Sequence, residues 1–397
     1  MDINEPNALL PTPLGCLEVL SNISNSSLIR FSLILPTYNE GMNIQKVIAV
    51  LTELLDGILP EAYELIVVDD DSPDQTWKLA QALLPDYPQL QVMRRVAEKG
   101  LSTAVIRGWQ VARGEILGVI DADLQHPPEV LLSLWQQMQR GADLAVASRN
   151  ADGGGVSEWS LIRRFLSRGA QMLGLLILPE VISRLSDPMS GYFMIRRSAI
   201  ANRRLSPVGY KILIEAVARG RFPWISEVGY VFQERRAGES KVTWKQYVEY
   251  IQHLLRLRLF LSARFIQFCL VGFSGVFVDM GFLYLLSDPT TLHLPLTRSK
   301  IIAAELAIIN NFLWNDFWTF GDISRRQPGK RQRLKRLIKF NLICLAGLTI
   351  NVVILNLLFN VLGLNRYLAN LIAIALVTVW NFWFNLKLSW RVTDVGN

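Results

Sequence analysis

The sequence GVIDADLQHPP at residues 118–128 decides the fold, because an apolar run ends here in two aspartates that are one residue apart. The apolar residues from Ile116 to Ile120 are typical of a fully buried strand. Asp121 and Asp123 would then lie at the carboxyl end of that strand. Open α/β sheets bind their ligands at this position. The stretch therefore predicts a buried sheet and the location of a ligand site.

The side chains of Asp121, Asp123 and Gln125 offer oxygen donors that Mg²⁺ or Mn²⁺ accepts together with substrate phosphates. They indicate a metal site that binds a nucleotide diphosphate. In the alternative interpretation, the two aspartates cap a helix that Pro127 and Pro128 begin. An isolated DxD motif is compatible with both, and the rest of the chain favours the metal site.

The composition predicts a soluble domain followed by a membrane domain. The chain has 397 residues and is 51% apolar, but its long apolar runs follow residue 262. The formal net charge of +7 lies mostly near those runs, which indicates contact with anionic lipid head groups rather than nucleic acid. The three cysteines suggest neither a disulfide framework nor a zinc site. Residues 1–29 lack the pattern of a signal peptide, so we expect a flexible extension and a cytoplasmic catalytic part.

Strands and helices alternate through the first half of the chain. FSLILPTYNE at 31–40 predicts a strand stopped by Pro36, the segment 41–57 predicts a helix, and YELIVVDDDSPD at 63–74 predicts a second strand with an acidic exit. This alternation predicts a doubly wound, mostly parallel sheet. Asp69 and Asp70 would then share the edge of Asp121 and Asp123, as the rim of a pocket. The absence of GxGxxG and GxxxxGK[ST] at a strand exit disfavours a dinucleotide-dependent dehydrogenase and a P-loop enzyme.

Eight ordered blocks carry a resemblance to glycosyltransferase family 2, and most closely to the dolichyl-phosphate mannose synthases. They are PTYNE at 36–40, VVDDDSPD at 67–74, EKGLSTA at 98–104, DADLQHPPE at 121–129, SRN at 148–150, DPMSGYF at 187–193, GYKILIE at 209–215 and RRAGESK at 235–241. The resemblance covers about residues 30–255 and implies a GT-A-type fold. It also implies transfer of a sugar from a nucleotide diphosphate to a polyprenyl phosphate.

The resemblance also implies roles for individual residues. The cation and the diphosphate would be held by Asp121, Asp123 and Gln125, and Asp123 and Gln125 would act in catalysis together with Arg235. The donor nucleotide would be bound by Pro36, Tyr38, Glu40, Asp69, Asp70, Lys99 and Asp121, and the acceptor phosphate by Arg149, Arg163, Ser167 and Lys241. Arginine and lysine suit phosphate, although any one of these cations could be a solvated surface charge, and Arg164 is a rival to Arg163. Asp71 departs from the family, which often has asparagine there.

The predicted reaction needs little acid–base chemistry. A polyprenyl phosphate is already largely anionic at neutral pH, so its oxygen can attack the anomeric carbon without a general base. We therefore interpret His126 as a packing residue. Because no protein nucleophile is evident, we expect direct displacement with inversion, and the charge of the leaving diphosphate would be stabilised by the cation and Arg235.

Two segments between the halves are amphipathic. FLSRGAQMLGLLIL at 165–178 is too short to span a bilayer about 30 Å thick, and WKQYVEYIQHLLRLRLFL at 244–261 mixes aromatic and leucine residues with cations. Each could be an ordinary core helix. Their position beside the apolar runs favours helices that lie on the membrane surface.

The second half predicts an all-α domain of four membrane spans, at about 264–287, 300–320, 336–361 and 367–388. The loop 321–339 carries eight cations and should face the cytoplasm. RFIQFCLVGFSG at 264–275 resembles RLIKFNLICLAG at 336–347, and NNFLWN at 310–315 resembles WNFWFN at 380–385. These tandem hairpins resemble a GtrA-like membrane domain. Asp316 should lie near the membrane interface. The other polar residues of the spans should face the bundle interior, and they are Asp279, Glu305, Asn311, Asn315, Asn351 and Asn381.

The sequence thus predicts five segments: an extension at 1–29, a GT-A domain at 30–242, an interfacial helix at 243–262, the membrane domain at 263–390 and a tail at 391–397. The expected activity is metal-dependent transfer of mannose from GDP-mannose to dolichyl or another polyprenyl phosphate. One alternative uses UDP-glucose and undecaprenyl phosphate. Another is a flippase or transporter whose soluble domain only binds a nucleotide sugar. The absence of a QxxRW-like segment disfavours a processive polysaccharide synthase.

Overall fold

The computed structural model describes residues 9–13, 15–23, 28–156, 161–233 and 244–391, except for the side chains of residues 156, 161–167, 244 and 245. The chain divides into two compact units, Met1–Arg258 and Leu259–Asn397. Each unit contains its own cluster of buried apolar side chains. The two units are described separately below.

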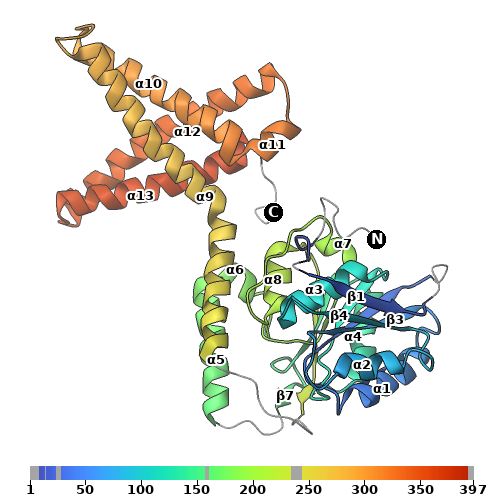
Figure 1. The fold of residues 1–397 in the computed structure, drawn as a ribbon. Helices are drawn as coiled ribbons and strands as arrows, with labels where there is room; N and C mark the ends of the chain where they lie inside the picture. Colours follow the sequence, from blue (N-terminus) through green and yellow to red (C-terminus); the bar gives the residue numbers. More distant parts are fainter. Residues whose placement is uncertain (1–8, 14, 24–27, 157–160, 234–243, 392–397) are drawn as a thin grey trace. The chain divides into compact units, whose positions relative to one another are not determined.

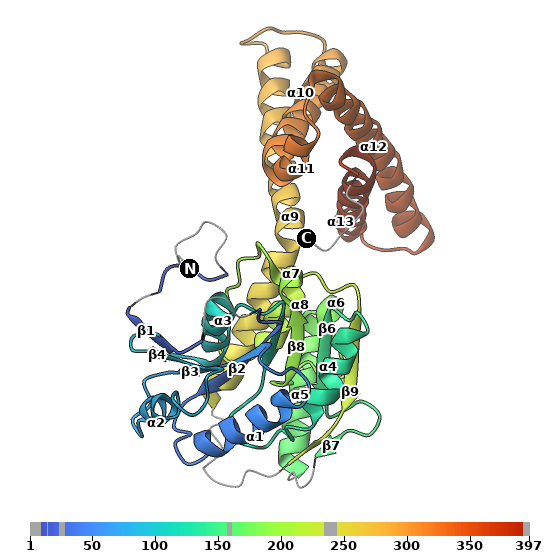
Figure 2. The same ribbon diagram turned by 90° about the vertical axis from the view of Figure 1, so that its right-hand side faces the viewer.

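The first unit is built around a mixed sheet whose strands have the order β1-β4-β3-β2-β5-β8-β6-β9 (Figure 1 and Figure 2). The central strand β2 pairs in parallel with β3 and β5, whereas β8 runs antiparallel to β5 and β6. This confirms the expected GT-A-type α/β fold. The strands are β1 Leu17–Ser21, β2 Phe31–Thr37, β3 Tyr63–Asp69, β4 Leu90–Arg95, β5 Ile116–Val119, β6 Leu144–Ser148, β8 Phe193–Arg196 and β9 Ile225–Gly229.

Helices cover both faces of this sheet. The helices α1 (Ile44–Asp56), α2 (Thr76–Ala82) and α4 (Val130–Gln139) contribute to the core cluster that includes Leu33 and Leu35 of β2. The opposite face meets α3 (Leu101–Val111), where a Cβ on Gly108 would lie 2.8 Å from the side chain of Ile34. Successive residues of β2 therefore point to opposite layers, and β2 is buried along its whole length.

Two details of the sheet differ from the prediction. Pro36 does not stop β2, because the strand continues to Thr37 and Pro36 pairs with Val68. The pairing of β2 with β5 already ends at Ile34. The missing N–H of Pro36 therefore costs no hydrogen bond to β5. In addition, part of the expected flexible extension is ordered, because β1 pairs antiparallel with β4. Sequence periodicity could not reveal β1, because most of its side chains are exposed.

The remaining elements of this unit are β7 (Gly155–Val156), which pairs with β10 (Val231–Phe232), and the helices α5 (Leu161–Ile177), α6 (Pro179–Ile182), α7 (Arg197–Ile200) and α8 (Ile212–Arg219). The helix α9 (Trp244–Ser287) contains the division between the units, so no break separates the predicted interfacial segment from the first predicted span. The first turns of α9 are fixed to α8 by a buried contact of 2.8 Å between His253 Nε2 and Glu215 Oε2. Tyr250 also donates a 3.0 Å hydrogen bond to the carbonyl of Ala170 in α5.

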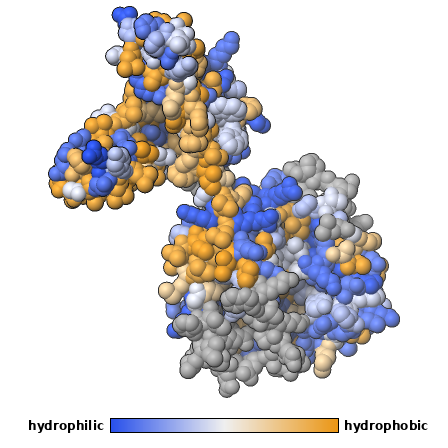
Figure 3. Space-filling view, turned by 60° about the vertical axis from the view of Figure 1, so that its left-hand side comes forward, coloured by the Kyte–Doolittle hydropathy of each residue, from blue (hydrophilic) through white to orange (hydrophobic). Residues whose placement is uncertain are grey.

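The helices α5 and α9 expose a large apolar surface in the first unit. Figure 3 shows apolar side chains gathered over these helices, and they include Met172, Leu175 and Leu176 from α5 and Val248 and Leu255 from α9. Soluble proteins rarely expose a contiguous surface of this kind. Both predicted amphipathic segments are thus helical, with an apolar side that the core does not cover.

The second unit contains the helices α10 (Leu296–Trp314), α11 (Gly321–Arg326), α12 (Lys330–Asn356) and α13 (Arg366–Phe384) in addition to the rest of α9. Short π-helical segments follow three of them: η1 (Asn315–Thr319), η2 (Leu357–Val361) and η3 (Asn385–Ser389). Among the residues described, three helices are long and apolar enough to cross a membrane, at Gln246–Ser287, Lys330–Val361 and Arg366–Ser389. The predicted span at 300–320 is helical but more polar, because it carries Lys300, Glu305 and several asparagines.

The internal repeat is visible as two matching close contacts. A Cβ on Gly275 would collide with the side-chain amide of Asn311, and one on Gly347 would lie 2.5 Å from Oδ1 of Asn381. Only glycine therefore allows the two helices of each hairpin to approach so closely.

Two expectations about the polar residues and the basic loop need correction. Glu305 is exposed rather than interior, and it accepts a 3.0 Å hydrogen bond from Asn341 on α12. Much of the predicted basic loop at 321–339 is helical, because it contains α11 and the beginning of α12. Its cations therefore have defined positions on two helices.

Candidate active site

The carboxyl ends of β2, β3, β5 and β6 place the candidate residues on one edge of the sheet. These strands end at Thr37, Asp69, Val119 and Ser148, and the chain leaves each of them into a loop that carries predicted site residues. Parallel strands bring their carboxyl ends to the same edge, so the loops meet. The position agrees with the expectation from the two acidic strand exits.

The loop after β5 has a strained and well-anchored backbone. Leu124, between the predicted ligands, has a φ of 58°, a left-handed conformation that is costly for a branched side chain. The Gln125 amide donates to Oδ1 of Asp123 at 3.1 Å, and the Gln125 side chain donates to the carbonyl of Gln233 at 3.2 Å. Asp123 and Gln125 are both buried. The loop therefore fixes the positions of both side chains.

The alternative in which the aspartates cap a helix is not supported. The helix α4 begins at Val130, and its N-cap residue is Glu129, which makes no capping hydrogen bond through its side chain. Asp121 and Asp123 lie seven or more residues before this helix. Neither aspartate therefore caps α4.

His126 is packed rather than exposed to a substrate. Its ring lies within 5.2–5.4 Å of the rings of Tyr192, Tyr230 and Phe232. Its Nε2 atom is 3.4 Å from Oδ2 of Asp121. His126 therefore contacts the Asp121 carboxylate while its ring packs against aromatic side chains. This agrees with the packing role expected from the sequence.

A buried ion pair follows β6. Arg149 donates from Nε to Oδ2 of Asp187 at 2.6 Å and from Nη2 to Oδ1 at 2.8 Å. Burial alone would raise the pKa of Asp187, but the hydrogen bonds and the charge of Arg149 lower it overall. Burial would likewise lower the pKa of Arg149, but the hydrogen bond and the charge of Asp187 raise that pKa overall. Arg149 is thus held as a cation in a fixed orientation.

Lys211 is a functional candidate that the sequence did not single out. Its Nζ donates to the carbonyl of Met189 at 3.0 Å. Burial, followed by the positive charge of Arg149, lowers the pKa of Lys211 to about 8, while Asp187 and Asp121 oppose the shift. Lys211 is linked to the Arg149 ion pair through Met189, because the Met189 amide donates to Oδ1 of Asp187 at 3.3 Å. The GYKILIE block contained it, but only the fold brings it to this edge.

The predicted donor-binding residues divide into buried and exposed members. Asp69 accepts hydrogen bonds from Thr37 and Ser72, and burial raises the pKa of Asp69 in spite of them. Asp70 accepts from Arg95 and, at 2.6 Å, from the amide of Gly100. Both carboxylates thus support the loops around the site.

The remaining donor-binding candidates lie after β2 or near it. Tyr38 is 39% exposed, and Lys99 Nζ lies 5.7 Å from the centre of its ring. Glu40 accepts a 2.9 Å hydrogen bond from Asn43, and Pro36 lies within the strand. The exposed ring of Tyr38 is the surface in this group on which a planar base could stack.

The side chains of four predicted phosphate-binding residues lie outside the described part of the structure. Arg235 and Lys241 lie outside the described residues, and so does the rest of the RRAGESK block. Arg163 and Ser167 fall within α5, but their side chains are outside the described part of the structure. Among the predicted acceptor-phosphate residues, the structure therefore describes the side chain of Arg149.

The donor set is compatible with a divalent cation. Within the described residues, no three side chains of the His, Cys, Asp or Glu type form a metal cluster. Two carboxylates and one amide oxygen instead match an ion that completes its shell with water and substrate phosphates, which is how Mg²⁺ is usually held. The chemistry of Asp121, Asp123 and Gln125 therefore fits such an ion.

Comparisons with known proteins agree with this architecture. Residues 32–203 match the family described as Glycosyl transferase family 2, and residues 267–390 match the GtrA/DPMS transmembrane domain. The chain is 40% identical over 363 residues to a dolichol-phosphate mannosyltransferase of Pyrococcus furiosus, which covers 91% of this chain and 99% of the relative. It is 36% identical over 244 residues to the dolichol-phosphate mannosyltransferase of Saccharomyces cerevisiae, covering 58% of this chain and 88% of that protein. Among solved structures, mannosyl-3-phosphoglycerate synthase from Rubrobacter xylanophilus aligns with a TM-score of 0.42 and 21% identity, over 59% of this chain and 75% of that one.

Proposed function

The chain belongs to the dolichol-phosphate mannosyltransferases of glycosyltransferase family 2, and from that premise we propose that it transfers mannose from GDP-mannose to a polyprenyl phosphate. The observation that supports this most directly is that Asp121, Arg149 and Lys211 all meet the segment 187–191. Arg149 pairs with Asp187, Lys211 donates to the Met189 carbonyl, and a Cβ on Gly191 would lie 3.0 Å from Oδ2 of Asp121. Carboxylates there suit a cation and its diphosphate, and the two cations suit a second phosphate. The product would be polyprenyl-phosphate mannose.

In the proposed donor site, Asp121, Asp123 and Gln125 hold the diphosphate end of the nucleotide. A bound Mg²⁺ or Mn²⁺ would neutralise the charge that develops on the leaving diphosphate. The strained backbone at Leu124 and the hydrogen bond from Gln125 to Gln233 keep these side chains in place before the donor arrives. The proposed base and ribose contacts come from Tyr38, Glu40 and Lys99, and Pro36, Asp69 and Asp70 shape the wall behind them.

The acceptor phosphate is proposed to lie against Arg149 and Lys211. Asp187 orients the Arg149 guanidinium, and the Met189 carbonyl orients the Lys211 ammonium. We also assign Arg163, Ser167 and Lys241 to the acceptor phosphate, and Arg235 to the leaving diphosphate. The acceptor oxygen already carries negative charge, so no side chain has to remove a proton. A single displacement of this kind inverts the anomeric configuration.

The protein is a membrane protein, and we place the first unit on the cytoplasmic face. The cations of α11 and α12 support this orientation, because positively charged segments beside spans stay in the cytoplasm. We retain four spans, with α10 as the polar member of the bundle. The apolar side of α5 and the first turns of α9 would rest on the lipid surface, where a polyprenyl phosphate is reached.

A donor panel tests the proposal. The full-length protein in lipid nanodiscs would receive labelled GDP-mannose, UDP-glucose or GDP-glucose, with a short polyprenyl phosphate and either Mg²⁺, Mn²⁺ or a chelator. We expect label in the organic-extractable lipid from GDP-mannose only, and none with the chelator. Labelled lipid from UDP-glucose alone would support the glucosyltransferase instead. Binding of donor without any transfer would support the alternative of a flippase or transporter.

A further inference from the structure

A pocket of about 450 Å³ lies in the second unit, at the junction of η1, α11 and the first turns of α12. Its walls include Asp316, Ser324, Arg325, Lys330, Arg333 and Arg336. The volume is within the range of sites that bind small molecules and head groups. None of the residues proposed for donor or acceptor binding in the first unit lines it.

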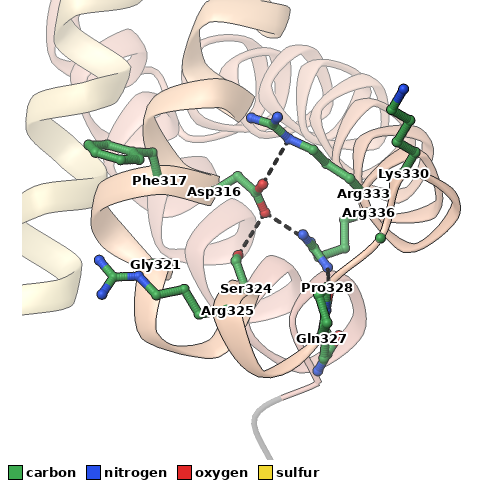
Figure 4. A pocket seen from close by; sticks show the side chains of 11 residues that line it. Asp316, Phe317, Gly321, Ser324, Arg325, Gln327, Pro328, Lys330, Arg333 and Arg336 are labelled. Carbon is green, nitrogen blue, oxygen red and sulfur yellow. Dashed lines mark hydrogen bonds and ion pairs between the residues drawn. The ribbon is translucent and has the colours of Figure 1, made fainter.

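One wall of the pocket is a rigid polar network centred on Asp316. Figure 4 shows Arg333 and Arg336 converging on this carboxylate from α12 and Ser324 reaching it from α11. The Asp316 oxygens lie 2.9 Å from Nε of Arg336, 3.1 Å from Nε of Arg333 and 2.7 Å from Oγ of Ser324. Arg336 and Asp316 are both buried. Asp316 therefore has a structural role inside the second unit.

Trp390 and Phe320 connect the same network to the aromatic core of the unit. Trp390 Nε1 donates to Oγ of Ser324 at 3.0 Å and to Oδ1 of Asp316 at 3.3 Å. The Trp390 ring is stacked on Phe320 with 4.3 Å between ring centres. Both belong to the buried cluster of this unit. The pocket wall is thus connected to the core.

The pocket carries a surplus of positive charge. Four cations line it, against the single carboxylate of Asp316. Arg325 and Lys330 are exposed, and in Figure 4 their charged ends point away from Asp316 on two sides of the pocket. Within the described part of the chain, neither forms an ion pair with a carboxylate. The first residues of α12 also line the pocket, and the unpaired amides of a helix start favour an anion.

We propose that this pocket is a phosphate-binding site that takes the phosphate of a membrane-lipid head group. In the bound state the exposed side chains of Arg325 and Lys330 turn toward the phosphate oxygens from two sides of the pocket. The network of Asp316, Arg333 and Arg336 fixes the wall against which the head group rests. The planar fork of arginine matches phosphate geometry, and lysine adds a mobile point charge. The proposal does not depend on which sugar the first unit transfers, because it concerns the second unit alone.

The test compares two double variants of equal charge. Arg325→Gln with Lys330→Gln removes the two pocket cations, whereas Arg326→Gln with Arg331→Gln removes two exposed cations of the same helices that do not line the pocket. Full-length proteins in nanodiscs of neutral phosphatidylcholine receive a polyprenyl phosphate with a photoactivatable group beside the phosphate. Labelling of residues 321–336 is measured by peptide mass spectrometry. A probe with a free alcohol in place of the phosphate controls for mere insertion in the bilayer.

We expect the pocket variant to lose roughly tenfold in labelling relative to the matched control, the size of effect expected when charge-assisted hydrogen bonds are removed. Competitors identify the source of the phosphate: unlabelled polyprenyl phosphate, phosphatidylglycerol or inorganic phosphate. Displacement by any of them supports the site and assigns it to that source. Equal labelling of the two double variants, or equal labelling by the alcohol probe, overturns the proposal. A melting temperature equal to that of the wild type shows that the pocket variant is folded.

Discussion

Asp187 accepts two hydrogen bonds from the guanidinium of Arg149, at 2.6 Å from Nε and 2.8 Å from Nη2. Both side chains are largely buried, so each compensates the charge of the other. The pair connects the end of β6 to the segment before β8 and fixes the cation that we place at the acceptor phosphate. Its loss should affect stability as well as catalysis.

Replacing Asp187 by alanine is expected to lower the free energy of unfolding by about 3–5 kcal/mol, because it leaves the Arg149 charge buried and uncompensated. Thermal unfolding of the purified protein measures this. Asp86→Ala, at an exposed position, is the control and should be nearly neutral. Equal destabilisation by both substitutions would contradict a structural role for the pair.

The same pair predicts a dependence on pH. Arg149 lowers the pKa of Asp187 below its ordinary value, so the unfolded chain takes up the proton first as pH falls. The stabilisation is complete above the ordinary carboxyl pKa and is lost as pH falls through the lower, folded value. The difference in Tm between the wild type and Asp187→Asn should therefore shrink in acid. A difference that stays constant below pH 4 would argue against the ion pair.

The lowered pKa of Lys211 predicts opposite trends for acceptor-phosphate binding and for protein stability above pH 8. Burial and the charge of Arg149 lower its pKa to about 8, so the folded protein loses this proton earlier than the unfolded chain does. Stability should rise with pH between about 8 and the ordinary lysine value of roughly 10.4, while affinity for the acceptor phosphate falls. Lys211→Met should remove both trends, and Lys211→Arg should keep the affinity. Titration with a short polyprenyl phosphate and thermal unfolding across this range provide the two measurements.

The apolar side of α5 should contact lipid. A spin label at Leu176, which is 80% exposed, is expected to be accessible to oxygen and protected from a water-soluble nickel chelate in nanodiscs. A label at Leu79 on α2, which is 47% exposed, is the control and should show the reverse. Equal access of the chelate to both labels would contradict an interfacial role for α5.

Much of the fold could be predicted because buried parallel strands have a distinct sequence pattern. The apolar runs before Asp69 and Asp121 identified β3 and β5, and their acidic exits located the site edge. The edge strand β1 was missed because its side chains are mostly exposed. The reversed direction of β8 depends on long-range pairing that no local pattern contains.

The site was predicted less completely, for a related reason. Motif spacing identified Asp123 and Arg149, but the partners that orient them are far apart in the chain. Asp187 and Lys211 reach the same edge only when β8 and α8 are in place. In the second unit, the cations of 321–339 indicated an orientation, whereas the pocket required knowing that α11 and α12 bring them around Asp316.

The central claim is that the end of β5 binds the donor diphosphate for transfer to lipid, and Asp123 tests it most directly. Formation of polyprenyl-phosphate mannose from GDP-mannose should be compared for Asp123→Asn and the exposed control Asp86→Asn, in the full-length protein. We predict that Asp123→Asn lowers the rate by about 10²–10³-fold, as expected when stabilisation of leaving-group charge is lost, while the control keeps wild-type turnover. Unchanged transfer by Asp123→Asn in a correctly folded protein would contradict the account.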